Sequence, residues 1–225
     1  MCVGADTGAC KGAAMSIDRR HFLAAGAAFA AGVSAAGTAG AKTNYTEADY
    51  FTGTTHDNGF DFRRTNMKTI EARWHRQLVP FEHKEPPGVI VVDTKNHFLY
   101  LTFENNTALR YGIGVGKEGF QWFGRAQVMR KALWPGWTPP PEMLLRRPEL
   151  PKHMDGGPDN PLGPRAMYLY RDGKDLDYRI HATLEPWSIG EDVSSGCIRL
   201  LPEEVIDLFQ RIPVGTYVEV LKHLG

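Results

Sequence analysis

The sequence predicts a mainly β protein whose compact domain is of the β-sandwich or barrel-like type, with few short helices. Short runs rich in β-branched and aromatic residues recur from Gly88 onward and are separated by turn-forming residues. Only one segment has clear helical periodicity. A long Pro/Gly/Trp-rich stretch between the runs cannot form the interior of a helix or sheet. Many short strands with little helix indicate a sandwich or barrel.

The strand-like runs share alternating or continuous apolar character and are bounded by turn signals such as Asn105-Asn106 and Asp172-Gly173. Seven strands are expected, at 89–93, 98–103, 108–115, 125–132, 166–170, 178–182 and 216–221.

One helix is expected near the C-terminus. Pro202 suits the first helical position, and Glu203 and Glu204 are favourable in the first turn. An apolar face at helical spacing follows, and Pro213 and Gly215 end the segment. The residues of that face are Val205, Leu208, Phe209 and Ile212.

The Pro/Gly-rich stretch contains Trp134 and Trp137 and ends in Asn160-Pro161-Leu162-Gly163. A loop of this length is usually a lid, a binding wall or disordered, and the tryptophans argue against disorder. The alternative is that the two tryptophans only cover a satellite apolar cluster.

Length and charge restrict the class of protein. The chain has 225 residues, 42% of them hydrophobic, which suffices for one domain with a sizeable core and additional segments. Its 26 basic and 26 acidic residues give a formal net charge of zero, and no basic stripe favours nucleic-acid binding. Residues 42–87 are polar without clear periodicity, so an extension or linker is expected there, followed by the main domain at 88–222.

The N-terminal residues 1–41 are typical of an export signal. Arg19-Arg20 precedes an uncharged Ala/Gly-rich stretch, and Ala39-Gly40-Ala41 offers a cleavage site between small residues. This pattern predicts a twin-arginine signal that is removed on export. An Ala-rich helix or a membrane anchor is the alternative, although the stretch is short and weakly apolar for a membrane span. No membrane span is expected in the mature protein.

Removal of the signal would leave Cys197 as the one cysteine, because Cys2 and Cys10 precede the cleavage site. A single thiol in an oxidising compartment is either buried in the core or reactive. Its neighbours Ser194, Ser195 and Gly196 favour an exposed backbone, and His181 lies sixteen positions earlier at the end of a strand-like run. These features favour the reactive alternative.

A cysteine paired with a histidine is suited to acyl transfer. A free thiol, with a pKa of about 8.5, is mostly protonated at neutral pH and needs a base or a positive field to become a thiolate. Gly196 would allow close approach of a substrate and leave backbone N–H groups to hold an oxyanion. No set of residues has metal-ligand spacing, no helix follows the glycines of Gly112–Gly116 to form a phosphate site, and a papain-type protease has the opposite order of cysteine and histidine.

The residues from Tyr178 to Thr183 and from Ser194 to Arg199 together resemble the L,D-transpeptidase (YkuD-type) family of peptidoglycan enzymes. The resemblance implies that Cys197 is the nucleophile and His181 its base. Two positions depart from the family pattern: Ser195 stands where histidine is usual, and Ala182 where glycine is usual. Arg199 matches a family arginine and would either bind a substrate carboxylate or hold the loop through an ion pair. The remaining oxyanion or substrate-binding candidates are Ser194, Ser195, Gly196 and Ala182.

The resemblance also implies an exported enzyme, in the periplasm or cell envelope, that contributes to cell-wall biogenesis and cell shape. Cys197 would form an acyl-enzyme with a tetrapeptide stem and pass it to an amine, either of a second stem or of an envelope protein, without cofactor or metal. The alternatives are an L,D-carboxypeptidase that releases the terminal D-alanine and a non-catalytic peptidoglycan-binding envelope protein.

Overall fold

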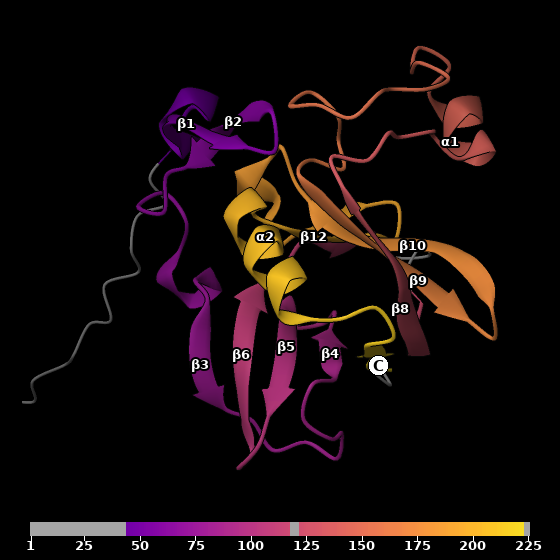
Figure 1. Cartoon of the computed structure of the whole chain (residues 1–225). Helices are drawn as coiled ribbons and strands as arrows, with labels where there is room; N and C mark the ends of the chain where they lie inside the picture. The colour runs from indigo at the N-terminus through magenta and orange to yellow at the C-terminus, as the bar shows by residue number, and fades with distance from the viewer. Residues whose placement is uncertain (1–43, 118–121, 223–225) are drawn as a thin grey trace, which may run out of the picture. The chain divides into compact units, whose positions relative to one another are not determined.

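A nine-stranded mixed sheet is the frame of the protein (Figure 1). The structure is a computed structural model that describes residues 44–117 and 122–222, so the predicted export signal lies outside the described residues. The strand order is β12-β10-β9-β8-β13-β4-β5-β6-β3. Its strands, in chain order, are β3 (Gln77–Pro80), β4 (Ile90–Asp93), β5 (Phe98–Phe103), β6 (Thr107–Gly112), β8 (Gly124–Leu133), β9 (Arg165–Arg171), β10 (Lys174–Ala182), β12 (Ile198–Leu200) and β13 (Tyr217–Val220).

The prediction of a mainly β protein is confirmed, and all seven expected strands are present. The run at 108–115 is divided between β6 and the short strand β7 (Val115–Gly116), which pairs with β11 (Asp192–Ser194). The turn between β9 and β10 contains Asp172 and Gly173, both with positive φ, which a tight hairpin turn requires.

One apolar core joins the two ends of the sheet. Side chains from β4 and β5 share a cluster with side chains from β9 and β10, including the fully buried Leu99 and Met167. Helix α2 (Pro202–Arg211) contributes Val205 and Leu208 to the same cluster and packs against β9 and β10. It starts at Pro202 as expected, and Figure 1 shows it crossing the middle of the molecule.

The described part of segment 42–87, expected to be a polar extension or linker, is folded as part of the same unit. It forms the hairpin β1 (Phe51–Asp57) and β2 (Phe60–Thr65), and β3 becomes the edge strand of the main sheet. Its strands are mostly exposed, so they carry little of the apolar alternation by which a strand is recognised in a sequence.

The hairpin is tied to the loop after β8. Asp57 forms an ion pair with the buried Arg165 at Nη1–Oδ2 2.7 Å, and the Trp134 indole N–H donates to the Asp57 carboxylate at 2.8 Å. Phe60 packs against Trp134, with ring centroids 4.9 Å apart. Trp134 is therefore an anchor between the hairpin and the start of β9.

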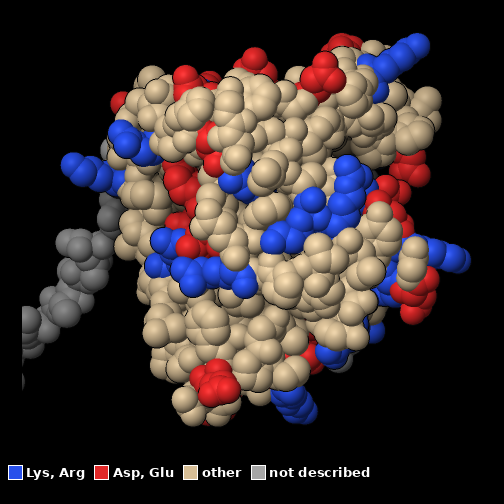
Figure 2. Space-filling view, in the orientation of Figure 1, with Lys and Arg blue, Asp and Glu red and all other residues tan. Residues whose placement is uncertain are grey.

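Basic and acidic side chains are interspersed on the face shown in Figure 2, in keeping with the zero net charge of the chain. None of the helices in the described ranges has the length and apolar character that a membrane crossing needs.

Candidate active site

Two parallel neighbouring strands bring Cys197 and His181 to one place. His181 is in β10 opposite Arg199 of β12, and Ile180 is opposite Ile198. Cys197 immediately precedes β12, so its backbone lies beside that of Arg179, two residues before His181. Both side chains line the same groove. The sixteen-residue spacing thus corresponds to a loop that leaves β10 and returns alongside it.

The loop before the cysteine is held by Ser194, which is buried. Its hydroxyl donates to the Cys197 carbonyl oxygen at 2.6 Å and accepts the Gly196 N–H at 3.2 Å. Gly196 has φ of 111°, a conformation that residues with a Cβ rarely adopt. The tight loop therefore needs both a small hydroxyl residue at 194 and glycine at 196.

His181 is buried with its Nδ1 atom 2.6 Å from the carbonyl oxygen of Ala182. The backbone carbonyl of Pro161 also acts on the ring and raises its pKa. Because a carbonyl can only accept, Nδ1 carries the proton and Nε2 is left as the basic nitrogen. Burial, with the charges of Arg199 and Arg179 adding to its effect, lowers the pKa of His181 to about 3, against the two carbonyls. The resting imidazole is therefore neutral over the whole physiological range.

Cys197 is half-buried and is not part of a disulfide. Burial raises the pKa of its thiol, whereas a backbone hydrogen bond from Arg179 and the charges of Arg179 and Arg199 lower it. The burial effect is the larger, so the direction of the shift is upward. A protonated thiol beside a neutral imidazole is the resting arrangement that follows.

The groove around these residues has a volume of about 1100 Å³. One wall is the Pro/Gly-rich stretch, including Trp137 and the short helix α1 (Pro141–Arg146), which no sequence pattern indicated. Trp137 lines the groove, whereas Trp134 is buried behind it. Each of the two alternatives for this stretch therefore applies to one tryptophan: Trp137 forms part of a binding wall, and Trp134 covers an apolar cluster.

The other predicted site residues are near the pair in different roles. Ser195 is exposed and lines the groove. Arg199 also lines it, but its guanidinium forms an ion pair with Glu185 at 3.1 Å. Ala182 is buried, and its methyl group occupies the space that a Cβ of Gly163 would need, 2.6 Å from that position. The fold accommodates alanine at 182 because position 163 is glycine.

Asn160 is a structural residue to which the sequence alone assigned no role. It is buried, and its side-chain amide donates to the carbonyls of Pro135, Met154 and Asp155, while its Oδ1 accepts the Leu162 N–H at 2.9 Å. It thereby joins both ends of the groove wall to the segment that presents the Pro161 carbonyl to His181. In the sequence, the only indication of this role was that Asn160 begins the run Asn160-Pro161-Leu162-Gly163 at the end of the Pro/Gly-rich stretch.

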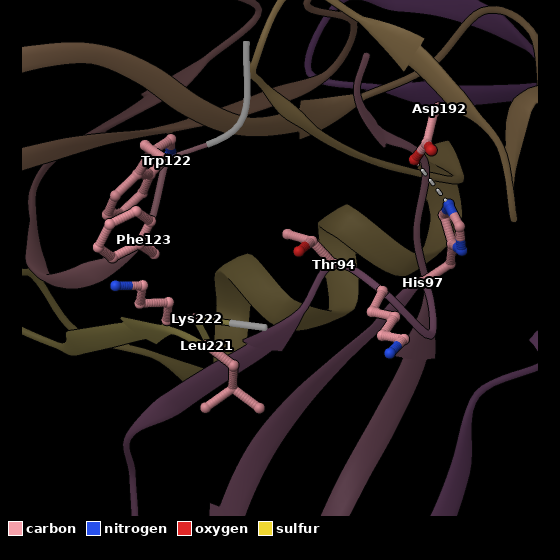
Figure 3. Close-up of a pocket in the computed structure, with 8 residues that line it drawn as sticks. Thr94, His97, Trp122, Phe123, Asp192, Leu221 and Lys222 are labelled. Carbon is pink, nitrogen blue, oxygen red and sulfur yellow. Dashed lines mark hydrogen bonds and ion pairs between the residues drawn. The ribbon is translucent and has the colours of Figure 1, made fainter. Parts of the chain in front are cut away.

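A second cavity, of about 360 Å³, contains neither Cys197 nor His181 (Figure 3). His97 and Asp192 form a hydrogen bond of 3.0 Å on one side of it, and Trp122, Phe123 and Lys222 lie on the other. Asp192 begins β11, so His97 supports the strand that leads to Ser194. Across the described ranges, no group of three or more His, Cys, Asp or Glu side chains is placed to hold a metal ion.

Comparison with known proteins gives one consistent family. Residues 87–220 match the family model YkuD, the L,D-transpeptidase catalytic domain. The probable L,D-transpeptidases ErfK/SrfK and YbiS of Escherichia coli K12 are 36% and 34% identical over 142 residues, which cover 60% of this chain and 44% of each of those proteins. The chain thus spans less than half the length of either relative.

A crystal structure described as a probable carnitine operon oxidoreductase caia from Brucella melitensis is 45% identical, covering 70% of this chain and 99% of that one, with a TM-score of 0.46. The family match alone covers more than half of the chain. The chain belongs to the YkuD family of L,D-transpeptidase catalytic domains.

Proposed function

We propose that this protein is a cysteine-dependent L,D-transpeptidase that acts on the stem peptides of peptidoglycan. The observation that carries the proposal is the shared groove of Cys197 and His181, in which the Ala182 carbonyl at Nδ1 leaves Nε2 as the base. Family membership supports the reaction class, and the groove supports an extended peptide substrate.

In the first half-reaction, His181 accepts the thiol proton as the Cys197 sulfur attacks the carbonyl of the third residue of a tetrapeptide stem. The tetrahedral intermediate collapses, the terminal D-alanine leaves with the proton from His181, and a thioester remains. In the second half-reaction, an acceptor amine gives a proton to His181 and attacks the thioester. A new amide forms and the thiol regains its proton.

The buried imidazole is neutral, and therefore able to accept a proton, at any pH well above 3. Ser195 and Arg199 line the groove where a substrate would lie, and Ser194, Gly196 and Ala182 shape the backbone around the thiol. The Ala182 methyl group is accommodated by Gly163, so this departure from the family pattern leaves the groove unobstructed.

The reaction is tested by incubating the purified protein with disaccharide tetrapeptides and identifying the products by mass spectrometry. Cross-linked dimers with release of D-alanine are expected. Tripeptides alone would instead identify a carboxypeptidase that uses water, and unchanged substrate from a correctly folded preparation would identify a non-catalytic binding protein. An added lysine-bearing envelope protein tests the alternative acceptor.

We also propose that the protein is exported to the periplasm or cell envelope by a twin-arginine signal containing Arg19 and Arg20. Replacing both with lysine is expected to retain the protein in the cytoplasm, as measured by cell fractionation. Unchanged export of that variant would point to the general secretory route.

A further inference from the structure

A row of three side chains runs across the sheet toward the reactive thiol. Arg130 of β8 is opposite Tyr168 of β9, and Tyr168 is opposite Arg179 of β10. Cys197 continues the row beside Arg179. Neighbouring strands lie about 4.8 Å apart, so the backbone of Arg130 is only about 14 Å from that of Cys197. All four side chains line the groove.

The guanidinium groups of Arg130 and Arg179 both lie over the ring of Tyr168. The Cζ atom of Arg130 lies 4.3 Å from the centre of the Tyr168 ring, and that of Arg179 lies 4.5 Å from it. An aromatic face orients a guanidinium without using its N–H groups, so its donors remain available.

The groove is basic although the chain is neutral. Six of its lining residues are basic and two are acidic, against equal numbers over the whole chain. A groove lined mostly by one sign of charge raises the local concentration of oppositely charged ligands. The basic residues are Lys117, Arg130, Arg146, Arg147, Arg179 and Arg199, and the acidic ones are Asp177 and Glu185.

Arg130 has no carboxylate partner among the described residues, unlike three other arginines of this set. Arg179 makes two hydrogen bonds to Asp175, at 2.6 and 3.1 Å, and Arg199 and Arg147 pair with Glu185 and Glu149. Arg130 is exposed, and its guanidinium makes neither a hydrogen bond nor an ion pair with any residue in 44–117 or 122–222. Its donors face a peptide-sized groove and are unused.

We propose that Arg130, oriented by Tyr168, binds a free carboxylate of the donor peptide and so selects donors in which that carboxylate is not amidated. The inference rests on the proposed function, because it takes the occupant of the groove to be a stem peptide. A guanidinium binds a carboxylate through two parallel hydrogen bonds, and an amide cannot accept both. The candidates are the two carboxylates that flank the scissile bond: the C-terminal one and the one on the side chain of the diamino acid.

The test measures peptide binding in the Cys197→Ala background, where no turnover occurs. Three synthetic tetrapeptides are compared: one with both carboxylates free, one amidated at the diamino-acid side chain, and one amidated at the C-terminus. Dissociation constants are measured by calorimetry with Arg130 unchanged and with Arg130→Gln, Arg130→Lys or Arg125→Gln. Arg125 is a matched control, since it is on the same strand and lies over the ring of Tyr217 at 4.5 Å outside the groove.

Arg130→Gln is expected to weaken binding of the free peptide roughly 10- to 100-fold, the usual range for a hydrogen bond to a charged group. One of the two amidated peptides should bind the protein with Arg130 as weakly as the free peptide binds the Arg130→Gln variant. Its binding should not weaken further on Arg130→Gln. The position of the amide in that peptide identifies the carboxylate that Arg130 binds. Arg130→Lys should retain part of the affinity because it keeps the charge, and Arg125→Gln should retain all of it.

Dissociation constants that do not change on Arg130→Gln for any of the three peptides would overturn the inference. A loss of the same size for all three would also overturn it, since it would show a general effect on the groove. Because binding is measured without turnover, this outcome is independent of the product analysis that tests the proposed function.

Discussion

At the residue scale, burial sets the protonation of the two reactive groups. It lowers the pKa of His181 to about 3 and raises the pKa of the Cys197 thiol. Each shift favours the neutral form, so a thiolate–imidazolium pair is not the resting state. The positive charges of Arg179 and Arg199 lower the pKa of both groups. This favours the charged form of the thiol and the neutral form of the imidazole.

A carbapenem has a strained carbonyl that the Cys197 thiolate can attack, so it serves as a probe of this site. Its acylation rate should depend weakly on pH in the acid range. A group with a lowered pKa loses its neutral form only as pH falls toward the lowered value, so the rate should hold from pH 8 to about pH 5 rather than decline below 6.5, the ordinary histidine value. The acylation rate is measured from the mass of the intact protein as a function of time at several pH values. A half-maximal rate near pH 6.5 would contradict the assigned state of His181.

Replacing His181 with Gln should slow acylation near neutral pH by roughly 10²- to 10⁴-fold, the range for loss of a general base. The difference in acylation rate between parent and variant should become smaller as pH rises toward the pKa of the thiol, because hydroxide then removes the thiol proton. If parent and variant have the same rate at each pH, His181 is not the base.

The spacing and neighbours of Cys197 and His181 were sufficient to predict this pair as a hypothesis from sequence. The groups that orient the histidine were not predictable, because they are main-chain carbonyls at Ala182 and Pro161, and any residue has a carbonyl. Arg130 was missed for another reason: its relation to Cys197 depends on the register of four strands.

At the scale of elements, the N-terminal hairpin holds the groove wall in place. Asp57, the last residue of β1, contacts both the Trp134 indole and the buried Arg165. Hydrogen bonds from Arg165 lower the pKa of Asp57 to about 2, with the Trp134 and Asn58 contacts adding to the effect. Gly156 packs so closely on the Trp134 carbonyl that a Cβ would lie only 1.9 Å from it. Hairpin, loop and β9 are thus joined at one point.

Asp57→Ala should lower the free energy of unfolding by on the order of 3 kcal/mol, because it leaves the Arg165 charge buried without a partner. It should also reduce carbapenem acylation, since the Trp134 anchor of the groove wall is lost. Asp61→Ala is the matched control on the same hairpin: its pair with His56 is exposed and should contribute little.

The effect of Asp57 should also depend on pH. A carboxyl group with a lowered pKa stabilises the fold fully above its unfolded value of 3.8 and loses that contribution as pH falls toward 2. The difference in melting temperature between parent and Asp57→Ala should be constant from pH 8 to 5 and shrink below pH 4. A difference that grows on acidification would contradict the ion pair.

Elements with strong apolar patterns were predictable, and short or exposed ones were not. β5 begins and ends at the expected residues, and α2 starts at the expected proline. β11 and β12 have three residues each, which is too few to show a period. β1 and β2 are mostly exposed. Strand order depends on contacts between distant segments, as in the parallel pairing of β13 with β4, and no local pattern encodes it.

At the scale of the whole molecule, the sheet places the reactive loop beside a large basic groove in a chain with no net charge. The core that joins both ends of the sheet keeps β10 and β12 in register, and that register keeps Cys197 and His181 in the same groove. Cys197 itself is only half-buried and takes no part in the main core, so its replacement should remove chemistry without loss of fold.

The most direct test of the central claim is the mass of the intact protein after rapid mixing with a tetrapeptide donor in the absence of acceptor. A covalent adduct equal to the donor minus D-alanine is expected, located on Cys197 by peptide mapping and absent from Cys197→Ala at unchanged melting temperature. D-Alanine release by Cys197→Ala at the parent rate, or an adduct on any other residue, would contradict the assignment of Cys197 as the nucleophile.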